Sequence, residues 1–302
     1  MATILITGGT GLIGRALTAA LVADGHTVRH LSRFSRDGSG VKTFTWDVAS
    51  GQVDPRALDG VDHVVHLAGT PIADKRWTTA RVRELIDSRA GSARLLLRVA
   101  RTRGHSPKSF ISAAGIGYYG AITSAHVFNE EDPPANDVLG HISREWEAGV
   151  DEWSSLCRVV KLRSPIVLAH EGPLAKLAAP ARWGLAAPLG SGRQWMPWVH
   201  IDDLVRAYQQ AISDERMHGA YNVTATEQPT NRDLMRAVAT ALGKPFFLPP
   251  VPGFALKLAL GELANVILHG SRASNARLLA TGFRFEHNTL SEALTSIFST
   301  HR

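Results

Sequence analysis

The chain has 302 residues, of which 44% are hydrophobic and 20% charged, a composition typical of a globular protein and not of a disordered one. The formal net charge is +6, but the arginines are spread along the chain without a dense basic run, so a nucleic-acid partner is not expected. A single cysteine, Cys157, excludes an intrachain disulfide and favours the cytoplasm. We predict no membrane span, because the most apolar late stretch, 254–268, is short and interrupted by charges.

The first half of the chain alternates between short apolar runs, typical of buried strands, and apolar residues at helical spacing. Strands are predicted at 4–6, 27–31, 42–46, within 61–67, at 109–112 and at 158–162. Helical patterns cover 12–21, 78–102 and 137–154. This alternation predicts the α/β class, with a doubly wound, parallel Rossmann sheet and right-handed crossovers.

The texture of the sequence changes after Arg163. Residues 171–199 are rich in Gly, Pro and Trp, whereas 200–213 is a helical pattern whose start we expect Asp202 and Asp203 to cap, and 220–223 is a strand. From about 227 the pattern is helical with Pro-rich joints. We therefore predict a dinucleotide-binding domain of residues 1–170, completed by 200–226, and a smaller, mostly helical substrate-binding lobe of residues 171–199 and 227–302.

A glycine-rich turn, Thr7-Gly-Gly-Thr-Gly-Leu-Ile-Gly14, follows the first strand and opens the first helix. Glycines at these spacings allow a tight turn, close approach of the backbone to a pyrophosphate, and close packing of helix on strand. The amides of the helix N-terminus then face the phosphates. We predict that a dinucleotide contacts the following residues of this turn: Gly8, Thr10, Gly11, Leu12, Ile13 and Gly14.

The end of the second strand bears on the choice between NAD(H) and NADP(H). It reads Leu31-Ser32-Arg33, with Arg36 nearby, and lacks the carboxylate that usually holds the ribose hydroxyls of NAD. A guanidinium suits a 2′-phosphate. We therefore predict NADP(H) in preference to NAD(H), with Arg33 as its anchor, the alternative being a solvated loop arginine. Asp47, at the end of the third strand, is a candidate acceptor for the adenine amino group.

Longer strings then carry a family resemblance. Together with the glycine turn, the segments 66–78, 111–120, 189–194 and 198–204 resemble an atypical subgroup of the extended short-chain dehydrogenases/reductases, in the NAD-dependent epimerase/dehydratase superfamily. The C-terminal segment of that subgroup is a domain of unknown function, resembled here by about 249–293. The resemblance implies that Leu67, Ala68 and Gly69 line the adenosine and ribose path. It further implies that Ser112 lies beside the nicotinamide, and that Arg163 and Pro165 belong to the segment that passes its carboxamide.

The sequence departs from that family at the catalytic residues. Members typically use a Ser after the fifth strand and a Tyr-x-x-x-Lys pair, in which the Lys lowers the pKa of the Tyr. Here these positions align with Ala114, Leu139 and Ser143, and no Tyr-x-x-x-Lys occurs in the chain. The candidate substitutes are Tyr118, Tyr119 and Ser112. The expected lining of the substrate cleft is Arg76, Trp77, Trp195 and His200, although the tryptophans could equally belong to the core. No metal site is predicted.

Two functions remain open at this point. The first is an NADP(H)-dependent oxidoreductase or epimerase-like enzyme that acts on a small carbonyl or carbinol compound with a non-standard proton donor. The second is a catalytically inactive NADP(H)-binding regulatory or scaffold protein. The expected partner is a small-molecule substrate, and a homodimer is left open.

Overall fold

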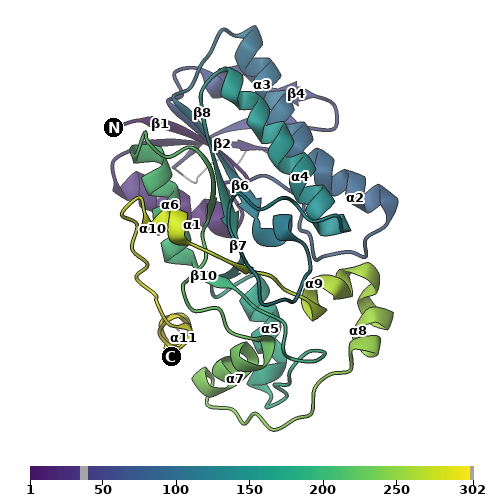
Figure 1. The fold of residues 1–302 in the computed structure, drawn as a ribbon. Coiled ribbons are helices and arrows are strands. Elements are labelled where there is room, and N and C mark those ends of the chain that lie inside the picture. The colour runs from purple at the N-terminus through teal and green to yellow at the C-terminus, as the bar shows by residue number, and fades with distance from the viewer. Residues whose placement is uncertain (35–39, 300–302) are drawn as a thin grey trace.

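A mostly parallel sheet runs through the centre of the computed structural model, which describes residues 1–34 and 40–299 (Figure 1). Within these residues the strand order is β11-β8-β6-β5-β1-β2-β3-β4, and only the β3–β4 pair is antiparallel. The strands are β1 (Thr3–Thr7), β2 (Thr27–Ser32), β3 (Lys42–Asp47), β4 (Gln52–Val53), β5 (His63–His66), β6 (Ser109–Gly115), β8 (Arg158–Ser164) and β11 (Gly219–Asn222). The predicted doubly wound α/β fold is confirmed.

The chain reverses direction across the sheet between β1 and β5. From β1 it proceeds outward through β2 and β3, and then returns to the other side of β1 to form β5, β6, β8 and β11 in turn. In open parallel sheets of this kind, ligands bind beyond the carboxyl ends of the strands where the strand order reverses. The topology therefore places the candidate site next to the ends of β1 and β5, where the glycine turn begins.

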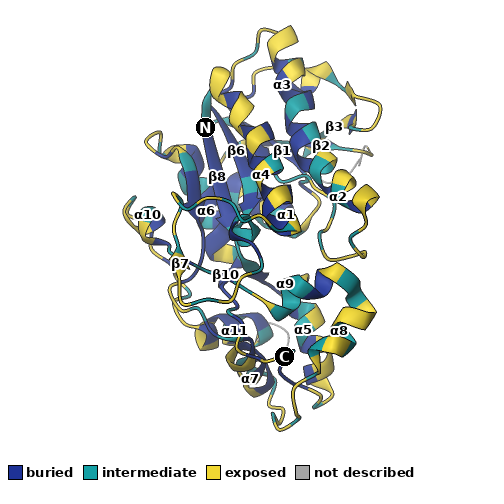
Figure 2. Ribbon diagram, turned by 45° about the vertical axis from the view of Figure 1, so that its right-hand side comes forward, coloured by how far each residue is buried: buried dark blue, intermediate teal, exposed yellow. Residues whose placement is uncertain are grey.

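Helices cover both faces of the sheet (Figure 1). Helix α1 (Leu12–Ala23) and helix α6 (Ile201–Ser213) pack on one face, over a core that includes Ile4, Ile6 and Val160. On the other face, α3 (Ser92–Thr102) and α4 (Val138–Asp151) cover Leu5, Val64 and Phe110. Figure 2 shows the result, with the strands buried and the outer faces of these helices exposed. Strands that are buried on both faces explain the continuous apolar runs of the sequence.

The long helical pattern at 78–102 is not one regular helix. Helix α2 (Thr79–Ile86) passes through a π-helical turn at Asp87–Gly91 before α3 continues. A π-turn inserts one extra residue into a helix and re-aims the side chains that follow. Here the turn carries Arg89, whose buried guanidinium donates to the carbonyl of Thr70 at 2.8 Å. The interruption therefore ties the helix to the loop after β5.

The C-terminal lobe has a core of its own, separate from the two cores of the sheet. Helices α5 (Pro173–Arg182), α7 (Asn231–Ala241) and α11 (Leu290–Ser299) pack around the fully buried Trp198. The remaining α-helices are α8 (Gly253–Leu260), α9 (Ala264–Leu268) and α10 (Ala276–Leu279). Two strand pairs lie outside the central sheet, β9 (Ile166–Leu168) with β10 (Trp198–His200) and β7 (Val127–Phe128) with β12 (Arg272–Ala273). None of the helices in the described ranges is long and apolar enough to cross a membrane.

Candidate cofactor-binding site

The glycines of the turn serve different purposes. Gly8 has φ +69°, and a Cβ there would lie 2.9 Å from the carbonyl carbon of Leu67, so this position needs glycine for both conformation and space. A Cβ on Gly14 would lie 2.4 Å from the carbonyl oxygen of Gly8. A Cβ on Gly11, in contrast, would meet only that oxygen, at 3.3 Å. Gly8 and Gly14 are required by the fold, whereas Gly11 leaves open the space in front of the N-terminus of α1.

This open space fits a pyrophosphate. Gly11 is the N-cap of α1, and the helix begins at Leu12, so the amides of the first turn point out of the helix end with no earlier residue of the helix to bond them. Thr10 is exposed, and Leu12 and Ile13 are half-buried at the same end. The predicted contacts of these residues with a dinucleotide remain predictions, but the geometry they require is present.

A hydrogen-bond network joins the ends of β1 and β5 beneath the turn. The Thr7 hydroxyl oxygen accepts from the amides of Leu67, at 3.2 Å, and Ala68, at 3.1 Å, and lies 2.9 Å from Nδ1 of His66. Full burial lowers the pKa of His66 to about 4, so the ring is neutral at physiological pH. The predicted backbone path along Leu67 and Ala68 is thus rigidly placed, by a histidine that the sequence analysis did not single out.

A second histidine supports the turn from below. A Cβ on Gly9 would lie 2.5 Å from the His30 ring, so the backbone of the turn rests directly on this side chain. Nε2 of His30 lies 2.8 Å from the Thr18 hydroxyl, which itself donates to the carbonyl of Gly14 at 2.6 Å. Burial lowers the pKa of His30 and favours the neutral ring. The signal for both histidines is a polar residue inside an otherwise apolar strand.

Gly69 and the loop that follows it are positioned by Arg89. A Cβ on Gly69 would lie 2.9 Å from Cζ of Arg89, so only glycine allows the guanidinium to pass under this loop. The same guanidinium lies 4.9 Å from the ring of Trp146. Gly69 lies just beyond the end of β5. Glycine is needed at this position because the buried Arg89 side chain passes close to its backbone.

The two residues predicted to select the adenosine end lie at the same edge of the sheet. Arg33 is exposed and directly follows β2, which pairs in parallel with β1 through Leu31 and Thr7. Asp47 is exposed at the end of β3, and its Oδ1 accepts from the amide of Ala49 at 3.0 Å. Arg36 lies outside the described residues. The position of Arg33 is the one expected of a 2′-phosphate anchor.

Two of the three candidate catalytic residues have fully buried side chains. The Ser112 side chain is fully buried, and its hydroxyl donates to the carbonyl of Ala113 at 2.7 Å. Tyr119 is also fully buried; its hydroxyl donates to Oδ1 of Asn222 and accepts from Arg163, both at 2.8 Å. Burial raises the pKa of Tyr119 to about 12. Both hydroxyls bond within the protein, and their candidate catalytic roles remain predictions.

Arg163 belongs to the same buried network. Its guanidinium forms a bidentate ion pair with Glu147, at 2.7 and 2.9 Å, and lies 3.7 Å from the ring centroid of Tyr118. Any contact of Arg163 with a cofactor would therefore come from its backbone, and the half-buried Pro165 follows it into β9. Tyr118 is half-buried and is the candidate that remains accessible.

Leu139 and Ser143, which are predicted to align with the family's Tyr and Lys, lie on α4 and are buried. Leu139 packs against Gly117, where a Cβ would lie 2.8 Å from the Leu139 side chain, and Ser143 is 5% exposed. An apolar side chain at the first position cannot transfer a proton. Leu139 and Ser143 therefore belong to the packed interior, and their alignment with the usual acid–base pair remains a prediction.

Three of the residues predicted to line a substrate cleft, Arg76, Trp77 and Trp195, donate hydrogen bonds to backbone carbonyls. Arg76 donates to the carbonyls of Leu258 and Ala259, at 2.6 and 2.9 Å, and so joins the loop after β5 to the end of α8. The indole nitrogens donate to carbonyls, that of Trp77 to Ile72 at 3.0 Å and that of Trp195 to Ser124 at 2.9 Å, and both side chains are half-buried.

His200, the fourth residue predicted to line the cleft, lies at the start of helix α6. It is 4% exposed, and its Nδ1 accepts from the amide of Asp202 at 3.2 Å, so His200 caps helix α6. The expectation that Asp202 and Asp203 cap this helix is wrong. Asp203 is fully buried and instead accepts from the amides of Glu286 and His287, because the chain before α11 crosses the start of α6.

Comparison with known proteins agrees with this geometry. Residues 4–139 match the model of the NAD dependent epimerase/dehydratase family, and residues 251–297 match a domain of unknown function, DUF1731. An epimerase family protein of Mycobacterium bovis is 38% identical, over 97% of this chain and 96% of its own. The chain belongs to the epimerase family. Its suspected place among the atypical members, with the additional C-terminal domain, is thus confirmed.

Solved structures extend the match to the whole fold. Human epimerase family protein SDR39U1 (isoform 2), whose crystal structure was determined with NADPH, is 32% identical, with a TM-score of 0.86 over 98% of this chain and 99% of the human one. A nucleoside-diphosphate sugar epimerase of Corynebacterium glutamicum is 28% identical, with a TM-score of 0.80 over 99% of this chain and 58% of its own. The family match therefore includes a structure that holds the reduced cofactor predicted here.

Proposed function

We propose that this epimerase family protein binds NADP(H) across the glycine turn and uses it in an oxidoreductase or epimerase-like reaction on a small carbonyl or carbinol compound. The observation that carries the proposal is the open approach to the N-terminus of α1 at Gly11, beside an exposed Arg33 at the end of β2. The NADPH in the structure of the human relative supports the same cofactor. Amides bind the pyrophosphate and a guanidinium binds the 2′-phosphate.

Tyr118 is the proton donor in this proposal. The cofactor supplies hydride chemistry when bound, and the chain must supply a proton to the reacting oxygen. Tyr118 is half-buried, follows directly on the end of β6, and lies against the guanidinium of Arg163. The contact of 3.7 Å between the guanidinium carbon of Arg163 and the ring centroid holds the Tyr118 ring in place.

A second function, a cofactor-dependent regulatory or scaffold protein without turnover, is favoured by one observation. The positions of the usual Tyr and Lys carry Leu139 and Ser143, both buried in the interior of α4. A protein that only binds the cofactor needs no proton donor there. The two functions share the cofactor site and differ in whether NADPH is consumed.

Cofactor selection is tested by titrating NADPH and NADH into Arg33→Ala, with Arg98→Ala as the matched control, an exposed arginine on α3. Loss of a charged hydrogen-bonding partner costs ~1.5–3 kcal/mol, so we expect NADPH affinity to fall at least tenfold in Arg33→Ala. NADH affinity should stay the same, because NADH has no 2′-phosphate. Unchanged NADPH affinity in Arg33→Ala would remove Arg33 from the site.

Turnover is tested by following NADPH absorbance with a panel of small carbonyl compounds, comparing wild type with Tyr118→Phe. An enzyme should oxidise NADPH with at least one compound, and Tyr118→Phe should lower that rate ~10²–10⁴-fold while NADPH affinity is retained. Equal rates in both proteins would rule out Tyr118 as the donor. Tight binding without consumption across the panel would favour the scaffold function.

A further inference from the structure

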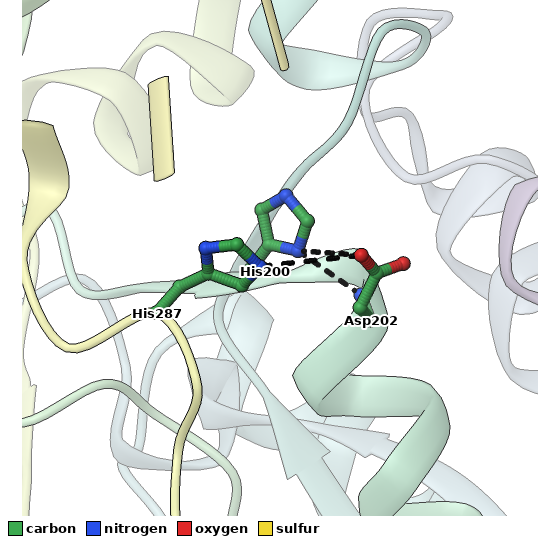
Figure 3. Close-up of side chains that lie close together, drawn as sticks. All are labelled: His200, Asp202 and His287. Carbon is green, nitrogen blue, oxygen red and sulfur yellow. Dashed lines mark hydrogen bonds and ion pairs between the residues drawn. The ribbon is translucent and has the colours of Figure 1, made fainter. Parts of the chain in front are cut away.

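Two histidines and an aspartate converge at the start of helix α6, outside the cofactor site (Figure 3). Nδ1 of His200 lies 3.5 Å from Oδ2 of Asp202, and Nε2 of His287 lies 4.0 Å from the same oxygen. The two imidazole rings are tilted by 35° relative to each other, with their centroids 3.7 Å apart. One ligand atom from each of the three residues falls within a 4.8 Å span.

These separations approach those of a metal centre. Zinc binds imidazole nitrogen and carboxylate oxygen at ~2.0–2.2 Å in a tetrahedron, which places neighbouring ligand atoms ~3.3 Å apart. The two nitrogen–oxygen distances of 3.5 and 4.0 Å exceed this value only slightly. The Asp202 side chain is 65% exposed and can rotate to close the difference.

The hydrogen bonds of His200 leave a lone pair on the nitrogen that faces Asp202. The Ser296 hydroxyl donates to the carbonyl of Ala293 at 2.9 Å, and its oxygen therefore accepts from Nε2–H of His200 at 3.2 Å. Nδ1 is then unprotonated, in agreement with the amide of Asp202 that donates to it. The lone pair of Nδ1 accepts from the Asp202 amide, and a carboxylate oxygen of Asp202 lies 3.5 Å from the same nitrogen, so a cation bound here would replace that hydrogen bond.

Ser296 also fixes the orientation of the ring. A hydrogen bond on the non-ligating nitrogen is the usual way in which metal-binding histidines are held in place. His287 is fixed as well, through its backbone, because the buried carboxylate of Asp203 accepts from its amide at 3.1 Å and from that of Glu286 at 2.7 Å. The contact with Ser296 therefore orients the His200 ring, and the contacts with Asp203 place the backbone of His287.

The local charge also favours a cation. Three carboxylates, of Asp202, Asp203 and Glu286, surround the cluster, and Arg206 pairs with two of them, with Asp203 at 3.1 Å and Glu286 at 3.2 Å. One guanidinium against three carboxylates leaves a negative surplus.

The cluster opens onto a cavity that leaves room for a further ligand. The cavity has a volume of about 360 Å³ and is lined by His200, Asp202, His170, Glu171 and the first turns of α1. A site with three protein ligands and an open side is the pattern of zinc centres that keep a water or a fourth ligand. Nitrogen ligands favour zinc and its neighbours over magnesium or calcium.

We propose that His200, Asp202 and His287 bind one divalent transition-metal ion of the zinc class. The ion joins the start of α6, in the dinucleotide-binding domain, to the segment that leads into α11 in the C-terminal lobe. The sequence analysis predicted no metal site, because the third ligand lies far along the chain in an irregular segment with no motif. Coordination at Nδ1 exchanges the hydrogen bond from the Asp202 amide for a metal bond.

The test is calorimetric titration of the full-length protein, without a histidine tag and freed of metal by chelation, with Zn²⁺ alone. We expect wild type to bind one equivalent, and His287→Gln and Asp202→Asn to bind at least tenfold more weakly. His269→Ala, which removes an exposed histidine of the same lobe, should bind as wild type does. Mg²⁺ should give no binding at the same concentrations.

A second readout keeps the result independent of folding defects. Circular dichroism establishes that each variant is folded, and Zn²⁺ should raise the Tm of wild type and of His269→Ala but not that of His287→Gln, because a metal that joins two segments binds only the folded state. No stoichiometric Zn²⁺ binding by wild type would overturn the proposal. Equal binding by His287→Gln, or weakened binding by His269→Ala, would also overturn it.

Discussion

Gly14 is required by the fold, whereas Gly11 leaves open the space in front of helix α1, and this difference can be tested by substitution. In Gly11→Ala the new Cβ meets only the Gly8 carbonyl oxygen, at 3.3 Å, and φ of −76° with ψ of 175° suits alanine. Alanine is a poorer N-cap than glycine, but its lower entropy in the unfolded chain offsets ~0.4–1 kcal/mol of this cost. The free energy of unfolding should therefore change by less than ~1 kcal/mol, a Tm shift of ~2–4 °C at most.

The same methyl group lies where a pyrophosphate must approach the backbone. Loss of one good amide–phosphate hydrogen bond costs ~1.5–3 kcal/mol, which corresponds to a ~10- to 150-fold weaker affinity for NADPH. Gly14→Ala behaves differently, because its Cβ would lie 2.4 Å from the Gly8 carbonyl oxygen and 2.6 Å from Cα of Gly9. The backbone must move, so this variant should lose stability and NADPH binding together.

The assay is thermal unfolding and NADPH titration of wild type and both variants in one buffer. We expect Gly11→Ala to melt near wild type but to bind weakly, and Gly14→Ala to melt early. If Gly11→Ala bound NADPH as wild type does, the space in front of α1 would not be the phosphate site. If it melted as early as Gly14→Ala, the separation of fold and ligand roles would be wrong.

Three further predictions concern residues that support the structure around the candidate site. His66 has a pKa of about 4 when folded and ~6.5 when unfolded, so the unfolded chain binds the extra proton between these values and stability falls as pH drops through that window. Between pH 7 and pH 5, urea unfolding should show wild type losing ~2 kcal/mol more than His66→Gln; equal losses would contradict the burial of a neutral ring. Glu147→Ala leaves the Arg163 guanidinium buried without its carboxylate and should cost ~3–5 kcal/mol in the same assay, whereas a loss below ~1 kcal/mol would mean that water reaches the pair. Arg76→Ala removes the donors at the end of α8, and hydrogen exchange of residues 253–260 should become faster with Tm unchanged; unaltered exchange would show that other contacts hold the helix.

Much of the fold could be predicted because its determinants are local. Apolar runs such as Ile4–Ile6 and the helical spacing after Leu12 each specify one element, and their alternation leaves few topologies. The strand boundaries shifted by only a few residues: the strand predicted at 109–112 extends to Gly115, and the one predicted at 158–162 to Ser164. The π-turn at Asp87–Gly91 was missed; it carries Arg89, whose contact with the loop after β5 is distant in the sequence.

The candidate site was predictable where its chemistry lies in the backbone. Gly8, Gly11 and Gly14 fall at fixed spacing between a strand and a helix, and steric rules assign their roles. The side chains that hold the turn from beneath, His30 and His66, were missed because their partners are distant in sequence or buried. A histidine in a strand shows its role only through what it contacts.

The catalytic residues were the least predictable part. Tyr118 and Tyr119 are adjacent in the sequence and looked equivalent, yet a 3₁₀ turn at Ile116–Tyr119 buries one ring and leaves the other half-buried. Likewise, Asp203 looked like a helix cap, but its carboxylate holds the chain before α11. Which of two neighbouring side chains points inward depends on packing that a single sequence does not contain.

We propose that the glycine turn and Arg33 together select NADP(H). This proposal is tested most directly by fluorescence titration of the wild-type protein with NADPH and NADH at one fixed salt concentration. We expect NADPH to bind at least tenfold more tightly than NADH, a difference of ~1.4 kcal/mol that comes from the 2′-phosphate. Equal affinities would contradict the role of Arg33, and binding of neither nucleotide would contradict the assignment of the glycine turn as a cofactor site.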